Sequence, residues 1–292
     1  MRSSGPGRPE RVRLPESLRG AAAELAAGTR VPAEPRDAAT VVLLRDGSTP
    51  GGPEVYLLRR HGRMAFAAGM AVFPGGGVDD RDRDAVSADG AWAGPTARQW
   101  ATRLGCGVAM ARGLVCAAVR ETFEEAGVLL AGPDAGTVVA DTTGDDWESD
   151  REALVAKAVS LADVLARRRL VLRTDLMRAW THWITPEVEP RRYDTRFFVA
   201  ALPVGQRTRD VSTESDAVAW MRPADAVAAA RAGELGMMPP TVGACADMAR
   251  FARAADALAA AASRTITPIA PQVVVDDDGV WLETTASPVA PR

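Results

Sequence analysis

Cysteine is scarce in this 292-residue sequence, and long apolar runs are absent from it. Cys106, Cys116 and Cys245 are too few and too scattered for a disulfide framework or a zinc site, which favours a reducing compartment. No apolar run approaches the roughly 18 residues that a membrane helix needs. The first residues also lack the apolar stretch of a secretory signal. These absences predict a cytoplasmic protein that has no membrane partner.

An excess of positive charge is missing as well. The sequence has 35 Lys+Arg against 38 Asp+Glu, a formal net charge of −3, and Lys157 is its only lysine. This balance argues against bulk electrostatic attraction to a nucleic acid. The 47% hydrophobic and 25% charged composition is that of an ordinary globular protein, which excludes a fibre or a disordered chain.

The length suits one elaborated domain or two small ones. Residues 1–36 are rich in Pro, Gly and Arg and predict a flexible arm with a short helix near residues 16–27. We expect the main domain at 37–265, with an insertion at about 78–107, and a tail at 266–292. Apolar residues on both sides of Asp276–Gly279 predict a hairpin in this tail.

The apolar pattern predicts both strands and helices in the main domain, without strict alternation and without an internal repeat. The predicted strands are 40–45, 54–60, 70–73, 128–130, 179–184, 193–202 and 216–221. The predicted helices are 108–126, 150–169, 223–235 and about 241–263, and Gly127 ends the first of them. The fold class is therefore α+β or α/β with a helical addition.

The predicted helix 108–126 ends in an acidic cluster, Arg120-Glu121-Thr122-Phe123-Glu124-Glu125. At about 100° per residue, the three glutamates fall within about 140° of Arg120, and Phe123 falls on the opposite, apolar face. Like charges at this spacing repel, and the helix dipole disfavours anions in the last turns. A cation offsets both penalties, and carboxylate oxygens suit Mg²⁺ or Mn²⁺.

The simpler interpretation of these glutamates is a solvated acidic face. Three neighbouring features favour a cation site instead. Gly75-Gly76-Gly77 follows a predicted strand and permits close backbone approach, and Gly127 stops the helix directly after the last carboxylate. Arg120 is placed to hold one carboxylate through its fork of N–H groups.

Gly76 and the segment Arg120–Val128 resemble the Nudix box, G-x5-E-x7-R-E-U-x-E-E-x-G-U, in which U is apolar. The resemblance implies an α/β/α sandwich with a mixed sheet, here with an insertion within the box and extra C-terminal helices. It also implies hydrolysis of a nucleoside diphosphate linked to another group, with divalent cations as cofactors.

The first half of the box departs from the family pattern. Residues 77–119 separate Gly76 from Arg120, which is a longer spacing than the box allows. Counting back from Arg120 gives Arg112 where the pattern has its first glutamate. We expect Asp79 or Asp80 to stand in for that missing carboxylate.

The interrupted box resembles the branch that includes the peroxisomal coenzyme A diphosphatase called nucleoside diphosphate-linked moiety X motif 19. The segments that carry this likeness are Phe73–Gly76, Cys116–Leu130, Trp183–Pro186 and Pro190–Phe198, so it extends over about residues 38–260. The coenzyme A signature of related enzymes is half present: Leu57, Leu58, Arg60 and Gly69 match it, whereas Arg59, His61 and Ala65 do not. Arg63 lies nearby and is a further candidate.

The resemblance implies roles for individual residues. Glu121, Glu124 and Glu125 would hold Mg²⁺ or Mn²⁺ supported by the backbone at Gly76, and Arg120 would orient Glu121 for catalysis. The substrate-binding candidates are Arg60, Arg63, Arg191 and Arg192, of which the last two form either a phosphate clamp or a surface cluster paired with neighbouring acids. Glu214 is the candidate for an extra carboxylate, with an exposed turn acid as the alternative.

The resulting hypothesis is a metal-dependent Nudix pyrophosphohydrolase. Its preferred small-molecule substrate is coenzyme A or acyl-coenzyme A; NADH, ADP-ribose and nucleotide sugars are the alternatives. A non-catalytic nucleotide-binding regulator is the rival class, because the first glutamate of the box is missing. We expect no nucleic-acid partner, and a homodimer is left open.

Overall fold

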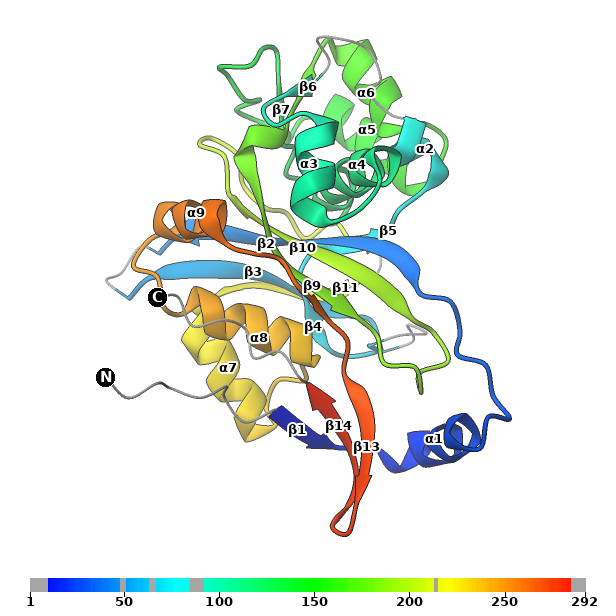
Figure 1. Ribbon diagram of the computed structural model, residues 1–292. Helices are drawn as coiled ribbons and strands as arrows, with labels where there is room; N and C mark the ends of the chain where they lie inside the picture. Colours follow the sequence, from blue (N-terminus) through cyan, green and yellow to red (C-terminus); the bar gives the residue numbers. More distant parts are fainter. Residues whose placement is uncertain (1–9, 48–50, 63–66, 85–91, 213–214, 285–292) are drawn as a thin grey trace, which may run out of the picture. The chain divides into compact units, whose positions relative to one another are not determined.

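The computed structural model describes residues 10–47, 51–62, 67–84, 92–212 and 215–284 (Figure 1). The chain divides into two compact units. The larger unit consists of Ala38–Thr181 and Arg196–Ile266, and the smaller one of Met1–Asp37, His182–Thr195 and Thr267–Arg292.

A sheet with the strand order β11-β3-β2-β10-β9 forms the centre of the larger unit. Its strands are β2 (Arg36–Asp46), β3 (Pro53–Arg60), β9 (Met177–Ile184), β10 (Tyr193–Ala201) and β11 (Ser215–Met221), of which β2, β9 and β10 each have residues in the smaller unit. Two short strands join it: β4 (Ala71–Val72) pairs with β3, and β5 (Gly75–Gly77) pairs with β2. In the β2–β5 pairing Ala39 lies opposite Gly76, which fixes the glycine-rich loop to the sheet.

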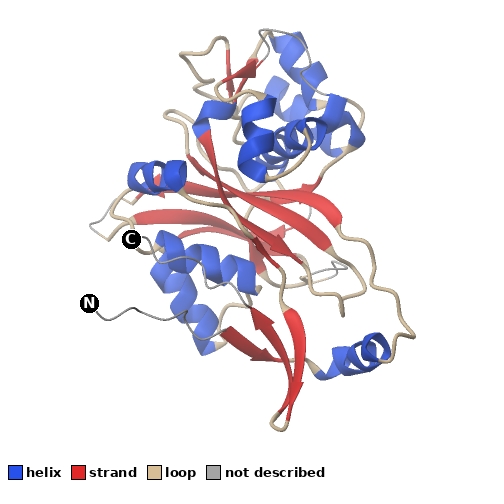
Figure 2. Ribbon diagram, viewed as in Figure 1, coloured by secondary structure: helices blue, strands red, loops and turns tan. Residues whose placement is uncertain are grey.

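Both faces of this sheet are buried. Successive side chains of a strand point to opposite faces, and in β2 both Val41 and Leu43 on one face and Val42 and Leu44 on the other are fully buried. Val41 and Leu43 belong to the main core together with helix α4 (Val108–Ala126). Helix α7 (Pro223–Ala232) packs on β3, and helices cover both sides of the sheet in Figure 2. The expected α/β/α sandwich is therefore confirmed.

Three helices pack directly on α4: α2 (Asp80–Asp84), α3 (Ala97–Leu104) and α5 (Asp145–Val155). The first two lie in the segment expected as an insertion, and α3 places Trp100 in the main core, 5.6 Å from the ring of Phe198. A small sheet with the order β6-β8-β7 completes this region, with β6 (Trp92–Ala93), β7 (Ala131–Gly132) and β8 (Val171–Arg173).

The single helix predicted at 150–169 is wrong, because the structure has two helices, α5 and α6 (Leu161–Arg168). Lys157 adopts a left-handed backbone with φ of 57° and ends the first. Ser160 starts the second through a capping box with Asp163. The helix predicted at 241–263 is likewise two helices, α8 (Pro239–Met248) and α9 (Ala254–Ser263).

The strand predicted at 128–130 is absent as well, although these residues are fully buried. The side-chain amide of Gln206 pairs with the backbone of Leu129: its oxygen accepts from the Leu129 N–H and its nitrogen donates to the Leu129 carbonyl, both at 2.9 Å. A buried backbone needs hydrogen-bond partners, and here a side chain supplies them instead of a neighbouring strand.

The smaller unit contains a sheet with the order β1-β14-β13. Strands β13 (Gln272–Asp276) and β14 (Gly279–Thr284) form a hairpin, and β1 (Glu10–Arg13) pairs antiparallel with β14. The described N-terminal residues hold this strand and helix α1 (Arg19–Ala26), which lies where the short helix near residues 16–27 was predicted. In the same unit β12 (Pro268–Ile269) pairs parallel with the end of β9. This pairing makes the sheet that contains β2, β3 and β9 a mixed one.

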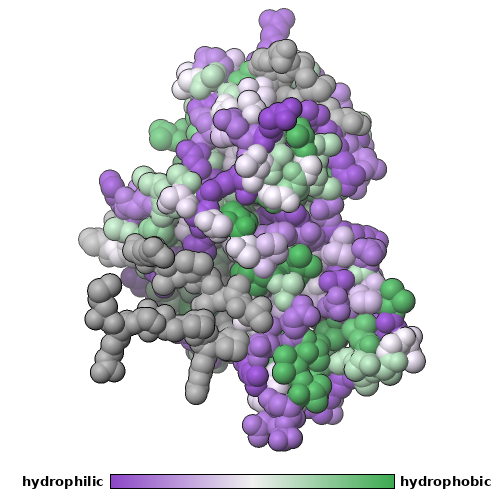
Figure 3. Space-filling view, in the orientation of Figure 1, coloured by the Kyte–Doolittle hydropathy of each residue, from purple (hydrophilic) through white to green (hydrophobic). Residues whose placement is uncertain are grey.

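Apolar side chains gather at the surface over α1 and β13 (Figure 3). The partly buried Leu18, Leu25 and Val273 belong to the small core around Leu14. Among the described residues, no single helix is both long and apolar enough to be a membrane span; only the pair α3–α4, bent by 94°, reaches that length and composition when joined.

Candidate active site

The acidic cluster lies in the last turns of α4, as predicted. The helix ends at Gly127, whose φ of 68° is left-handed and whose N–H donates to the Phe123 carbonyl at 2.9 Å. A Cβ atom at this position would lie 2.8 Å from Nε of Arg209, so two constraints select glycine here.

The glutamates of this cluster do not form a solvated acidic face. The side chains of Glu121 and Glu124 are only 13% and 12% exposed, and Glu125 is buried. Phe123 on the same turns is fully buried in the main core. A solvated face requires exposed carboxylates, so the simpler interpretation is wrong.

Arg120 connects the cluster to the glycine-rich loop. Its Nη1 donates to Oε1 of Glu121 at 2.7 Å and lies 3.3 Å from both carboxylate oxygens of Glu124. Its Nη2 donates to the carbonyl of Gly77 at 2.9 Å. The predicted contact between Arg120 and Glu121 is therefore present.

The other partner of Arg120 is Asp82 of α2. Nε donates to Oδ1 at 3.0 Å and Nη2 to Oδ2 at 2.8 Å, and the Asp82 side chain is 2% exposed. Asp82 is the sixth residue after Gly76, which is the position of the first acid in G-x5-E. The carboxylate of the first half-box is thus present as an aspartate, and the extra residues lie between it and Arg120.

The expectation that Asp79 or Asp80 replaces the first glutamate is therefore wrong. The Asp80 side chain is 94% exposed, and Asp79 pairs with Arg81 while its N–H donates to Oδ2 of Asp82 at 2.9 Å. Arg112, reached by counting back from Arg120, donates instead to the carbonyl of Arg83. Counting forward from Gly76 was the signal in the sequence that identifies Asp82.

The glycine-rich strand β5 holds the carboxylates at close range. The N–H of Gly75 donates to Oε2 of Glu125 at 2.8 Å. A Cβ atom at Gly76 would lie 2.3 Å from Oε1 of Glu121, closer than such contacts allow. Glycine at position 76 is thus required by the approach of the Glu121 carboxylate.

Burial shifts the protonation of this cluster. It raises the pKa of Glu121 to about 7, with Glu124 adding to the shift and Arg120 opposing it. Burial also raises the pKa of Glu124, against the positive charges of Arg120 and Lys157. Carboxylates taken out of water in this way need a compensating cation or a proton.

The donor set suits a divalent cation. Asp82, Glu121 and Glu124 bring three carboxylates to Arg120, and Glu125 is held beside them by the Gly75 N–H. Hard oxygens of this kind favour Mg²⁺ or Mn²⁺. Within the described residues, no three such side chains are already gathered in metal-binding geometry, because the Arg120 guanidinium lies between Glu121 and Glu124. The carboxylates of Glu121, Glu124 and Glu125 are chemically suited to such an ion, and Asp82 holds the Arg120 guanidinium beside them.

A second cluster, which the sequence did not indicate, fixes the end of α4. Nη1 of Arg151 donates to the backbone carbonyl of Glu124 at 2.9 Å. Glu148 accepts from Nε of Arg151 at 3.0 Å and from Nη1 of Arg209 at 2.7 Å. Cations beside the last carbonyls of a helix stabilise its C-terminus, so this cluster positions the acidic turns.

The remaining predicted residues are placed as follows. Arg60 is the last residue of β3, half-buried, with its backbone paired to Met70. Arg63 and Glu214 lie outside the described residues. Arg192 belongs to the smaller unit, where its guanidinium donates to the carbonyls of Thr185 and Ala33, and Arg191 beside it is exposed. The substrate-binding roles of these arginines stay predictions.

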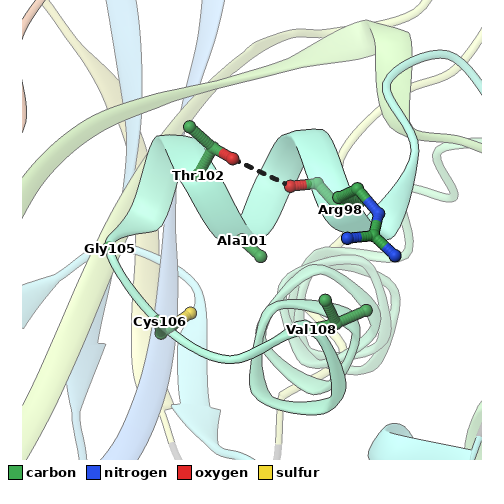
Figure 4. A pocket seen from close by; sticks show the side chains of 6 residues that line it. All are labelled: Arg98, Ala101, Thr102, Gly105, Cys106 and Val108. Carbon is green, nitrogen blue, oxygen red and sulfur yellow. Dashed lines mark hydrogen bonds between the residues drawn. The ribbon is translucent and has the colours of Figure 1, made fainter.

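A pocket of about 410 Å³ lies at the other end of α4 (Figure 4). It is lined by Arg98, Ala101, Thr102, Gly105, Cys106 and Val108. Val108 is the first residue of α4 and Glu121 is in its fourth turn, so at a rise of about 1.5 Å per residue the two lie about 20 Å apart. No carboxylate lines this pocket, and it is separate from the acidic site.

Comparison with known proteins identifies relatives of this chain. The family model described as the NUDT19 Nudix domain matches residues 96–250, which include α4. Acyl-coenzyme A diphosphatase NUDT19 of Xenopus laevis is 25% identical over 224 residues, and that of Gallus gallus is 28% identical over 254 residues. These alignments cover 64% and 70% of this chain but 57% and 65% of the relatives, so the chain spans less than two thirds of their length.

Among solved structures, the NUDIX hydrolase from Alicyclobacillus acidocaldarius is similar to this chain, with a TM-score of 0.64 and 27% identity. The match covers 80% of this chain and 99% of that one. This chain therefore has the fold of that hydrolase.

Proposed function

Because the chain belongs to the NUDT19 Nudix family, we propose that it hydrolyses the pyrophosphate bond of coenzyme A or acyl-coenzyme A with the help of a divalent cation. The observation that carries this proposal is the buried carboxylate set of α4, fixed by the ion pair between Arg120 and Asp82. The substrate class follows from the two relatives, which are acyl-coenzyme A diphosphatases by name.

Glu121, Glu124 and Glu125 are the residues that would hold Mg²⁺ or Mn²⁺. Such a cation supplies positive charge against the phosphates and makes a water molecule more acidic. The proposed cation is Mg²⁺ or Mn²⁺, and the proposed location of the protein is the cytoplasm.

The residues of the chain then have separate tasks. Asp82 and the Gly77 carbonyl hold Arg120, and Arg120 orients Glu121. The Gly75 N–H orients Glu125. One carboxylate of the set accepts the proton of the attacking water, whose oxygen bonds to one phosphorus as the bridging P–O bond breaks. Coenzyme A would give phosphopantetheine and adenosine 3′,5′-bisphosphate.

The rival class, a nucleotide-binding regulator without catalysis, was motivated by the missing first glutamate. Asp82 stands at that position and pairs with Arg120, which supports the enzyme over the regulator. Other dinucleotides, such as NADH and ADP-ribose, contain the same pyrophosphate bond and remain alternatives for the substrate.

The decisive experiment incubates the protein with Mg²⁺ or Mn²⁺ and coenzyme A, an acyl-coenzyme A, NADH, ADP-ribose or a nucleotide sugar. Products are separated by chromatography. Glu124→Gln should abolish turnover, and Glu234→Gln, the same change at an exposed glutamate, should retain it. Turnover of NADH or ADP-ribose alone would refute the coenzyme A assignment, and nucleotide binding without any turnover would refute the enzyme.

A further inference from the structure

Lys157 is the only lysine among 35 lysine and arginine residues, and its backbone is unusual. It follows α5 with a φ of 57°, a left-handed backbone conformation that residues other than glycine rarely adopt. Such strain persists where the surrounding structure holds the residue in place, and it is frequent at functional sites.

Arg81 holds the backbone of this residue. Its Nη1 donates to the carbonyl of Lys157 at 2.8 Å and to that of Val159 at 3.3 Å. Its Nε and Nη2 each lie 3.2 Å from an oxygen of Asp79. The guanidinium of Arg81 is thus committed to these partners, and it fixes Lys157 and Asp79 relative to each other.

The ammonium group of Lys157 is held more loosely. Nζ lies 3.4 Å from Oδ2 of Asp79, the longest of the contacts to that carboxylate, and 72% of the Lys157 side chain is exposed. Asp79 is already paired with Arg81, which holds the pKa of its carboxyl well below the usual range. An ammonium has three N–H donors, so Lys157 can turn to another anion without leaving Asp79 unpaired.

A short chain of contacts links Lys157 to the acidic site. The N–H of Asp79 donates to Asp82, and Asp82 holds Arg120. The ammonium therefore lies at the rim of the carboxylate set, in the same compact unit.

A polyanionic substrate needs such a cation. The carboxylates of α4 repel phosphates, and Arg120 is buried and committed to Asp82 and Glu121. We infer that Lys157 binds a phosphate group of the substrate at the rim of the acidic site. This inference rests on the proposed hydrolysis of a pyrophosphate bond, and it names the residue that receives one of the substrate's phosphates.

Because the sequence has one lysine, chemical modification can test the side chain directly. Acetylation removes the charge of Lys157, and the N-terminal amine is the only other primary amine of the chain. Acetylation of the wild type should raise the KM for coenzyme A about tenfold, as expected for a lost charge-assisted hydrogen bond. Reductive dimethylation, which retains the charge, should change it by less than about twofold.

Lys157→Arg keeps a cation that the reagent does not modify, so its KM should be the same before and after acetylation. An equal rise in this variant would assign the effect to the N-terminal amine and overturn the inference.

A binding measurement separates this inference from the proposed function. ADP with Mg²⁺ should slow the acetylation of Lys157, followed by mass spectrometry of its peptide, whether or not the protein hydrolyses anything. Protection without turnover would support the lysine while refuting the enzyme. An acetylation rate that saturating Mg²⁺–ADP does not change would overturn the assignment of Lys157.

Lys157→Gly removes the ammonium and suits the left-handed backbone, so it should fold as well as the wild type. Its KM should rise about tenfold while kcat changes by less than about threefold, because uniform binding is lost. Arg169→Gly is the matched control: Arg169 is also exposed, with a φ of 55° at the end of α6. The same change of KM in both variants, or in neither, would contradict a specific role for Lys157.

Discussion

Asp82 accepts hydrogen bonds from Nε and Nη2 of the Arg120 guanidinium, the shortest at 3.0 Å and 2.8 Å, although the two residues are 38 positions apart in the sequence. This ion pair joins α2 to the helix that carries the glutamates. It also leaves Nη1 of Arg120 to orient Glu121 at 2.7 Å. The interrupted box is thus closed in space by an aspartate and an arginine.

Asp82→Ala should strongly destabilise the protein. The change leaves a buried guanidinium without its main partner, which costs about 3 kcal/mol or more in buried pairs. Urea unfolding measures the loss of stability, and kcat should fall with it because Glu121 loses its orienting group.

Two variants define this effect. Asp82→Glu restores the acid that the family pattern has and should retain most of the stability and activity. Asp80→Ala on the same helix removes an exposed carboxylate and should change the free energy of unfolding by less than about 0.5 kcal/mol. If Asp82→Ala were as mild as Asp80→Ala, the ion pair would have no structural role.

Gly76→Ala should impair the acidic site more than the fold. The new Cβ atom would meet Oε1 of Glu121 at 2.3 Å, and the flexible carboxylate would have to move. We expect activity to fall at least about tenfold, equivalent to about 1.4 kcal/mol in the barrier, with weaker binding of Mn²⁺ in a titration calorimeter.

Gly20→Ala is the matched control for this change. Nothing lies within 4 Å of a Cβ atom at position 20, and alanine is the better residue inside helix α1. Activity should be unchanged and stability slightly higher. Unaltered activity of Gly76→Ala would show that the carboxylate of Glu121 does not need its present position.

The stability of the metal-free protein should depend on pH through Glu121. Burial raises the pKa of this group from its ordinary 4.5 to about 7, so the folded state binds a proton more tightly than the unfolded state. The resulting stabilisation is complete below about pH 4.5 and is lost as the pH rises through about 7. Unfolding by urea in the presence of a chelator should show this decrease.

Divalent cations should reverse the trend, because they bind the charged carboxylates and compete with protons. The stabilisation by Mg²⁺ should therefore increase with pH over the same range. Glu121→Gln has no proton to bind, and its metal-free stability should vary less with pH. An equally steep dependence in that variant would assign the effect to another group.

The acidic helix could be predicted because its signals are local. The helical spacing of Phe123 against the glutamates, and Gly127 after them, are contained within one stretch of sequence. The approach of Gly76 to Glu121 followed from the glycine-rich loop. Asp82 was identifiable too, but only by counting from Gly76, because the extra residues lie on its C-terminal side.

Other features depend on contacts that no local pattern reveals. The helical pattern of residues 150–169 is continuous, and the break at Lys157 is held by Arg81, which is distant in the sequence. The segment 128–130 has the apolar residues of a strand, yet the side chain of Gln206 takes its backbone hydrogen bonds. In both cases a long-range side-chain contact decided the local conformation.

Glu148→Gln should loosen the end of the acidic helix. Glu148 pairs with Arg151, which donates to the Glu124 carbonyl, and with Arg209, which lies against Gly127. Without the carboxylate charge, we expect a loss of about 1 kcal/mol of stability, since Glu148 is partly exposed and its ion pairs are screened. Hydrogen exchange should accelerate at the amides of residues 123–127, and kcat should fall.

Glu152→Gln, an exposed change on the same helix, should alter neither the exchange nor kcat. If both variants behaved alike, Glu148 would have no part in positioning Glu124.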